Sequence, residues 1–341
     1  MRRYMHPVLS SFILLLFISS INANEMVEEF KKHVTDKQKY FRNFKVVVSY
    51  EKTHPLGSED LITGRSESVK KVMQQHPTFT GSYTLIFDRD QSQFRCIHEG
   101  DKLHIRGDDA EIYREYSEAG YYKGYPVLYS PRDRNVALKN ADNDGGVLRK
   151  EIQKTCFPSG TPMMPMLPYV GIFPNPLLSS EPVRDYLNAS YYLMPDIEKS
   201  TANNLSYKLN GNIHQFVLQF VQNGNAITIE YDIKKDDVIK IARIQYSIKD
   251  NPSIIIDQIA YDAVKGVVFP KSWRMHSYLG QPRKLQYETL FTVMDQSWNH
   301  ESVAKESQLA IRPTDVFLFD TGKLVNITSH GLSEPSSEYP R

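Results

Sequence analysis

The sequence predicts an α+β protein built on a strongly curved antiparallel sheet, a half-open β-barrel of about ten strands with an N-terminal helix and an apolar mid-chain lid. From Leu205 to Met294, strand-length segments follow one another with only short polar turns between them, which is the pattern of a β-meander. An amphipathic stretch precedes the first strand, and an apolar, proline-rich stretch interrupts the strands in mid-chain. A long sheet with one apolar face covers that face by curling or by accepting a helix against it.

Residues 1–23 have the features of a secretory signal peptide. Arg2 and Arg3 precede an apolar run from Val8 to Ile21, and Ala23 offers a small residue for cleavage. The run is shorter than the roughly 20 apolar residues that span a bilayer. We therefore expect an exported protein, periplasmic or extracellular, that is soluble after cleavage. A retained N-terminal anchor is the alternative.

The mature chain is predicted to begin with a helix over Glu25–Asn43, because apolar residues recur along it every three or four positions. A strand follows at once from Phe44 to Tyr50, where apolar and polar residues alternate. Further strands are predicted at Thr80–Asp88, Gln93–Glu99, Lys102–Gly107 and Glu111–Tyr116, with turn-forming residues between them.

The clearest strand of the meander is Ala226–Ile233, in which every second residue is apolar. In the next segment the apolar phase changes after Ile241, and an extra residue near Ala242 predicts a β-bulge there. The last segment, from Leu285 to Val293, again presents one apolar face. These strands therefore share one dry side, which needs a cover.

The middle of the chain departs from this pattern. Gly120–Pro131 is predicted to be an aromatic loop, and Val183–Leu193 a short helix. Pro158–Pro182 is too apolar for a solvated loop, and its prolines exclude a continuous helix or a central strand. We expect it to lie over the sheet as a lid. No glycine- or serine-rich linker divides the chain, so residues 24–325 are predicted to form one domain with an insertion at 120–200, followed by a flexible tail at 326–341.

No sequence motif identifies a reaction. The chain lacks a nucleophile elbow, a zinc-protease motif, a phosphate loop and a dinucleotide fingerprint, so we expect neither enzymatic activity nor a cofactor. The formal net charge is +1 with both signs interspersed, which does not favour nucleic acid as a partner. His98 and His104 are the nearest histidine pair, and we expect exposed strand residues there, not a metal site.

One loop has the ligand spacing of an EF-hand calcium site, with Asn140, Asp142, Asp144 and, at the twelfth position, Glu151. The first ligand is Asn where the pattern requires Asp, and the preceding segment is a weak helix former. We expect a polar turn that does not bind Ca²⁺ tightly. A thermal melt with and without micromolar calcium tests this expectation.

Cys96 and Cys156 are the two cysteines of the chain. Because export would place them in an oxidising compartment, we expect them to lie close enough to form a disulfide between the early sheet and the mid-chain cover. The alternative is a pair of buried thiols. Cα atoms more than about 7 Å apart would exclude the bridge.

The order of these parts resembles the superfamily of periplasmic lipoprotein carriers and receptors (LolA and LolB) and the N-terminal domain of the sigma-factor regulator RseB. The likeness covers most of the mature chain and depends on arrangement, not on one motif. After the signal peptide and helix, it is carried by the strand from Phe44 to Tyr50, Gly81–Asp88, the apolar insertion, Tyr231-Asp232, Gly266–Pro270 and Phe317–Gly322.

The resemblance implies a half-open barrel whose concave face holds acyl chains beneath a lid. The flexible methionines of the lid also suit an adaptable apolar pocket. Lipid or lipoprotein acyl chains would then be the ligand, and a membrane-associated protein a further partner. This chain is longer than a minimal carrier, and the basic residue that the family carries on an early strand matches no position here. The expected ligand-binding residues are Met163, Met164, Met166, Leu167, Phe173, Ile227, Ile229, Tyr231, Leu285, Tyr287 and Phe291.

Two other classes of function remain open from the sequence. One is an exported interaction or sensor module whose sheet face is a filled core without a lipid ligand. The other is an exported hydrolase whose catalytic residues are too widely spaced to recognise. A deep apolar cavity would favour the carrier, a filled core the module, and a cleft with clustered polar groups the hydrolase.

Overall fold

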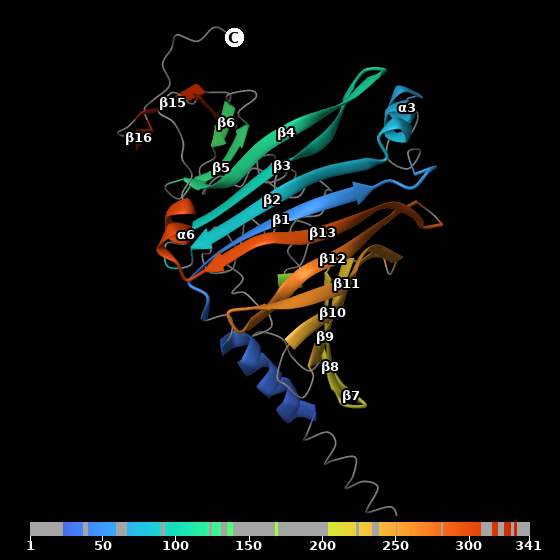
Figure 1. Ribbon diagram of the computed structural model, residues 1–341, viewed down its shortest axis with the longest axis vertical. Helices are drawn as coiled ribbons and strands as arrows, with labels where there is room; N and C mark the ends of the chain where they lie inside the picture. Colours follow the sequence, from blue (N-terminus) through green and yellow to red (C-terminus); the bar gives the residue numbers. More distant parts are fainter. Residues whose placement is uncertain are drawn as a thin grey trace, which may run out of the picture.

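Most strands of the protein join one large, curved and open sheet in the computed structural model (Figure 1). The structure describes residues 23–36, 40–58, 67–88, 90, 93–122, 125–130, 135–138, 168–169, 204–222, 225–233, 239–249, 251–280, 282–307, 316–319, 324–328 and 331–332. Within these residues the strands follow the order β16-β15-β14-β6-β5-β4-β3-β2-β1-β13-β12-β11-β10-β9-β8-β7. The predicted α+β class with a curved, mainly antiparallel sheet is confirmed. The described part of the chain has sixteen strands instead of about ten, and one pair of them, β6 and β14, is parallel.

The strands run from β1 near the N-terminus to β16 near the C-terminus. Their bounds are β1 (Asn43–Thr53), β2 (Thr78–Asp88), β3 (Gln93–Arg106), β4 (Asp109–Tyr122), β5 (Tyr125–Ser130), β6 (Asn135–Leu138), β7 (Leu205–Asn210), β8 (Ile213–Gln222), β9 (Asn225–Ile233), β10 (Ile239–Ile248), β11 (Asn251–Val264), β12 (Val267–Leu279), β13 (Lys284–Trp298), β14 (Val316–Phe319), β15 (Leu324–Thr328) and β16 (Gly331–Leu332). The described helical residues are 23–36 and 40, followed by α3 (Glu67–Gln75) and α6 (Glu301–Glu306).

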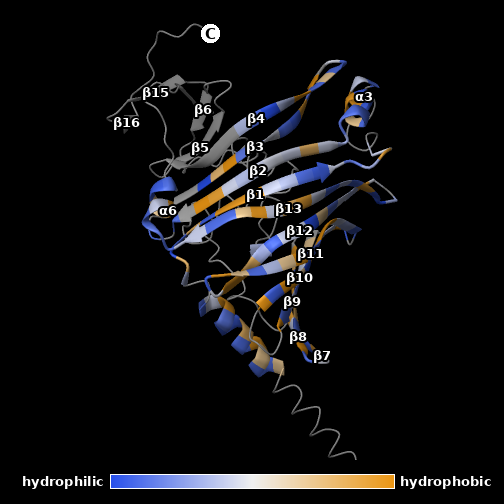
Figure 2. Ribbon diagram, in the orientation of Figure 1, coloured by the Kyte–Doolittle hydropathy of each residue, from blue (hydrophilic) through white to orange (hydrophobic). Residues whose placement is uncertain are grey.

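The predicted meander is confirmed as the run from β7 to β13, in which each strand pairs antiparallel with the next. The predicted bulge is also present, because the register of β10 against β9 shifts between Ile241 and Arg243 and leaves Ala242 unpaired. The extra residue keeps Ile241 and Ile244 on the same side of the sheet, and both are buried. Alternating hydropathy along the strands is visible in Figure 2.

The described part of the N-terminal helix comprises residues 23–36 and residue 40, and Phe41 is buried just beyond it. The stripe formed by Val27, Phe30 and Val34 is buried as expected. Phe30 stacks on Phe216 of β8 with ring centroids 4.4 Å apart, so the helix covers the β8 end of the sheet. Phe41 packs beside Phe44 instead, at the start of β1.

Two predictions for the early strands are wrong. The segments expected on either side of a turn at Gly100 form one continuous strand, β3, because Gly100 stays in register opposite Glu115 of β4. The expected loop over Gly120–Pro131 is a hairpin in which Tyr122 of β4 pairs with Tyr125 of β5. Prediction from turn-forming residues alone therefore gives too many strand ends, because pairing with a neighbouring strand can carry a strand through such residues.

Several other expectations fall partly or wholly outside the described residues. These are the signal peptide, the calcium loop, Cys156, the short helix at Val183–Leu193, and the lid residues Met163, Met164, Met166, Leu167 and Phe173. Cys96 itself is fully buried in the core. Strands β15 and β16 occupy residues 324–328 and 331–332, so part of the expected tail is strand. Among the described helices, none is long and apolar enough to cross a membrane.

The first and the last long strands meet at a seam between β1 and β13. Their antiparallel register runs from Phe44 opposite Trp298 to Thr53 opposite Glu288. Beyond the end of β13, the Asn299 side chain accepts from the Arg42 amide at 2.8 Å, and Lys45 pairs with Glu306 of α6 at 2.6 Å. These contacts join strands that are distant in sequence into one continuous sheet.

Candidate functional site

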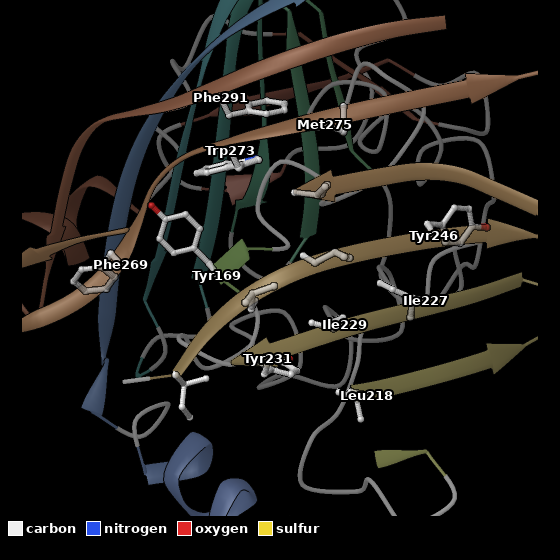
Figure 3. Packing of buried hydrophobic residues seen from close by; sticks show 14 of the residues in the cluster. Tyr169, Leu218, Ile227, Ile229, Tyr231, Tyr246, Phe269, Trp273, Met275 and Phe291 are labelled. Carbon is white, nitrogen blue, oxygen red and sulfur yellow. The ribbon is translucent and has the colours of Figure 1, made fainter. Parts of the chain in front are cut away.

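The candidate site is the inner face of the sheet, which we define as the face that carries Phe44 of β1, Trp273 of β12 and Ile229 of β9. The described residues on this side form one apolar cluster with the N-terminal helix. Figure 3 shows side chains from successive strands projecting to the same side. The outer face is different, because His276 of β12 lies 3.2 Å from Asp257 and 3.3 Å from Glu288. One side of the sheet is therefore dry and the other charged.

The residues predicted to line a ligand site on the sheet lie mostly together. Ile227, Ile229, Tyr231, Tyr287 and Phe291 are buried members of the inner-face cluster. Leu285, predicted to share this face, is only half-buried and stands outside the cluster. A register shift between β12 and β13 at Ser277 and Tyr278 separates Leu285 from the regular alternation.

Tyr169, within the stretch predicted to cover the sheet, is 2% exposed and packs against the inner face. Its ring meets Trp273 edge-on with centroids 6.0 Å apart and lies 6.1 Å from Phe44 (Figure 3). Its hydroxyl donates a hydrogen bond to the Pro270 carbonyl at 3.2 Å. Burial raises the pKa of Tyr169 well above its ordinary value, so the phenol stays a neutral donor. Residues on either side of the Pro168-Tyr169 pair lie outside the described residues.

We expect Tyr169→Phe to lower the free energy of unfolding by about 1 kcal/mol, because it deletes a buried hydrogen bond and leaves the Pro270 carbonyl without its donor. Chemical denaturation measures the change. Tyr40→Phe is the matched control, since Tyr40 is 56% exposed and should lose almost nothing. Equal stability of Tyr169→Phe and the parent would contradict a contribution from this hydrogen bond.

A second feature of the inner face is a buried tyrosine-histidine pair. The Tyr50 hydroxyl lies 3.0 Å from Nε2 of His98, with Tyr83 packed beside both rings. The Tyr50 side chain reaches His98 by crossing Gly81 of β2 and Gly100 of β3, which stand opposite each other. A Cβ atom at either glycine would collide with the Tyr50 hydroxyl. These two glycines provide the space that the pair requires.

The histidine expectation is corrected by this geometry. His98 is 1% exposed, not an exposed strand residue. His104 lies on the same strand, β3, and contacts Tyr113, so neighbouring strands do not bring the two histidines together. Burial, with the charges of Lys102 and Arg114, lowers the pKa of His98 to about 4, so it is neutral at pH 7. Among the described residues, no group of three or more His, Cys, Asp or Glu side chains could hold a metal ion.

The inner face becomes polar toward the end of β1. Lys52 continues the phase of Tyr50, and its ammonium lies 4.0 Å over the ring of Tyr287. His54, 6% exposed, packs between Phe79 and Tyr287. Burial and the nearby Lys52 charge lower the pKa of His54 to about 3, while the Gln286 backbone opposes this shift.

Three polar groups at this end have unused hydrogen-bonding capacity. Both ring nitrogens of His54 and the hydroxyl of Thr289 are buried without a hydrogen bond of normal geometry, although the Gln286 backbone approaches the His54 ring. Thr289 stands directly opposite Lys52 across the β1–β13 seam. We call Lys52, His54 and Thr289 the polar end of the inner face. Such a concentration of unsatisfied polar atoms is uncommon in a core and requires a physical explanation.

The sequence contained a signal for the polar end that was missed. The alternation predicted from Phe44 to Tyr50 extends in the same phase through Lys52 to His54, so both residues could have been assigned to the dry face. The part played by Thr289 was not accessible in this way, since it depends on the register between β1 and β13. Trp273 and Tyr169 likewise meet only through the fold.

Neither a comparison with protein-family models nor one with curated proteins finds a match. Among solved structures, the chain is similar to a DUF1329 family protein from Desulfovibrio piger, at 11% identity and a TM-score of 0.40, covering 81% of this chain and 94% of that one. It is also similar to a porin-like protein from Bacteroides uniformis, at 8% identity and a TM-score of 0.24, covering 74% and 98%. Similarities at this level carry no information about ligand or activity.

Proposed function

We propose that this protein is an exported, non-enzymatic binding protein that holds a lipid or acyl chain against the inner face of its open sheet. The observation that carries the proposal is the continuity of that face. Apolar side chains from β1 and from β8 to β13 form a single cluster that the N-terminal helix and Tyr169 join. An acyl chain is the simplest ligand for a long apolar surface, because it requires burial and few directed contacts.

The composition of the face supports a ligand of variable shape. Large rings such as Trp273 and Phe291, stacked with centroids 5.5 Å apart, provide extended apolar area, and Met275 beside them supplies a flexible, polarizable side chain. Charged side chains of the neighbouring strands point outward, as the Asp257–His276 pair shows. A lipid on the inner face would therefore contact a dry surface, while the outer face of the sheet contacts water.

Native mass spectrometry of the exported protein, purified without detergent, tests the proposal directly. We expect a mass excess that organic extraction removes and that corresponds to a lipid. Protein that carries no such mass, and that fails to bind a fluorescent fatty acid after delipidation, would contradict lipid binding.

A triple replacement in the predicted cover provides a second test. We expect Met163→Asp, Met164→Asp and Met166→Asp together to weaken binding of a fluorescent fatty acid by about tenfold or more, because each carboxylate would have to be buried beside the acyl chain. Fluorescence titration measures the affinity, and far-UV circular dichroism checks that the sheet is retained.

The matched control replaces the same three methionines by leucine, which conserves volume and apolar character. This variant should bind as the parent does. If the aspartate variant also binds as tightly as the parent, these methionines take no part in the site.

The interaction or sensor module is the second candidate, because the inner face resembles a filled core. Ile229, Ile256 and Trp273 are all 0% exposed. In that case the sheet would need no ligand, and a membrane-associated protein would be the partner. The delipidated protein distinguishes the two: a carrier should bind fatty acid with micromolar or better affinity, whereas a module should bind none.

A further inference from the structure

The position of Lys52 is unusual for a charged residue. It occupies an inward phase of β1, after Phe44, Val46, Val48 and Tyr50. Its neighbour across the seam is Thr289, a buried residue of the inner face. An exposed lysine such as Lys271 of β12, in contrast, projects to solvent and pairs with Asp262 at 3.3 Å. Lys52 therefore brings a positive charge to the dry side of the sheet.

No carboxylate of the described chain forms an ion pair with Lys52. Its ammonium contacts the face of the Tyr287 ring, and burial lowers its pKa to about 8. A desolvated ammonium without a counter-charge is costly to a folded protein. The same end of the face also holds the unused hydrogen-bonding groups of His54 and Thr289. A cation and two neutral polar groups together are suited to an anion.

A row of apolar residues begins at this polar end. Each member stands directly opposite the next on the adjacent strand. All are at most 2% exposed, so an acyl chain reaches them only by displacing the protein atoms that cover them in this structure. From Thr289 of β13 the row continues through Met275, Ile256, Ile244, Ile229, Leu218 and Leu205. At about 4.8 Å between strands, the five steps from β13 to β8 span about 24 Å along the sheet. One leaflet of a bilayer, and so one acyl chain, measures about 15 Å.

We propose that the ligand is an amphiphile with a single carboxylate head, such as a long-chain fatty acid, with the carboxylate at Lys52 and the acyl chain along the row from Met275 to Leu218. The inference depends on the proposed lipid-binding function and adds the polarity of the ligand and its direction on the sheet. Lys52 supplies the counter-charge, and the Thr289 hydroxyl and His54 ring supply neutral hydrogen bonds.

The test compares palmitic acid carrying a fluorophore at its ω-end with the methyl ester of the same probe. Lys52→Met should weaken binding of the acid by about tenfold or more, because a charge-assisted contact is lost, and leave binding of the ester unchanged. Lys52→Met should also fold, since it replaces a half-buried cation with an apolar side chain of similar length. Lys271→Met is the matched control at a solvent-exposed lysine and should change neither affinity.

Thr289→Val provides an independent variant, because it removes the unpartnered hydroxyl at nearly constant volume. It should weaken the acid several-fold and the ester less, because a hydrogen bond to a carboxylate is stronger than one to an ester carbonyl. If the parent binds acid and ester equally and Lys52→Met changes neither, the carboxylate assignment is wrong while lipid binding stands. If the parent binds neither probe, both the proposed function and this inference fail.

Discussion

Replacing Trp273 by alanine is expected to lower the free energy of unfolding by about 4 kcal/mol and the melting temperature by about 10 °C. Trp273 is fully buried at the centre of the inner face, stacked on Phe291 and met edge-on by Tyr169. Its deletion removes contacts to several elements at once and leaves a cavity that rigid strands cannot close. Chemical denaturation and differential scanning calorimetry both measure this loss.

The matched control for Trp273→Ala is Leu279→Ala on the same strand, β12. Leu279 is 40% exposed, so its truncation should change stability by less than about 0.5 kcal/mol. A loss below about 1 kcal/mol for Trp273→Ala would mean that the side chain is not a tightly packed part of the core. Partial loss of lipid binding in the same variant is expected if the proposed ligand lies on this face.

Acidification from pH 7 to pH 4 is expected to destabilise the protein by about 3 kcal/mol for each of the two buried histidines. In the folded protein the pKa of His98 is about 4 and that of His54 about 3, against about 6.5 when unfolded. Both histidines are neutral in both states above pH 7. As the pH falls below 6.5 the unfolded chain binds protons first, so stability is lost between pH 6.5 and the folded pKa values.

A double variant, His54→Gln and His98→Gln, should lose most of this pH dependence between pH 6.5 and 4. Denaturant titrations at several pH values measure the slope. His76→Gln is the control, because it makes the same replacement at an exposed histidine outside the core. Identical slopes for the double variant and the parent would show that other groups, such as the Asp101 carboxylate beside Thr80, dominate acid unfolding.

The architecture could be predicted from the sequence because it depends on local period. Alternation along Ala226–Ile233 identified β9 and its dry face, and the phase change beside Ala242 located the bulge in β10. The helix stripe of Val27 and Phe30 was also a local pattern, and both residues are buried. Such patterns can be recognised in the sequence because the residues that form them are neighbours on one element.

The polar features of the candidate site could not be predicted in the same way, because they depend on contacts between strands. His98 is buried beside Tyr50, whose side chain crosses Gly81 and Gly100 to reach it. Lys52 was readable as an inward residue, but its facing partner Thr289 follows from a pairing between the first and the thirteenth strand. The turn-like pair Gly100-Asp101 was read as a break because its pairing with β4 was unknown.

The seam between β1 and β13 also constrains the order in which the protein folds. Strands β1 to β4 pair with their sequence neighbours, as do β7 to β13, so each set can form from local contacts. The seam instead joins Asn43–Thr53 to Lys284–Trp298, with roughly 230 residues between, a loop closure that costs about 5 kcal/mol of chain entropy. During synthesis from the N-terminus, β1 can pair early with β2, but it lacks β13 on its other edge until almost the whole sequence has been made. High contact order of this kind slows folding, so the inner face stays open at this edge until β13 is in place.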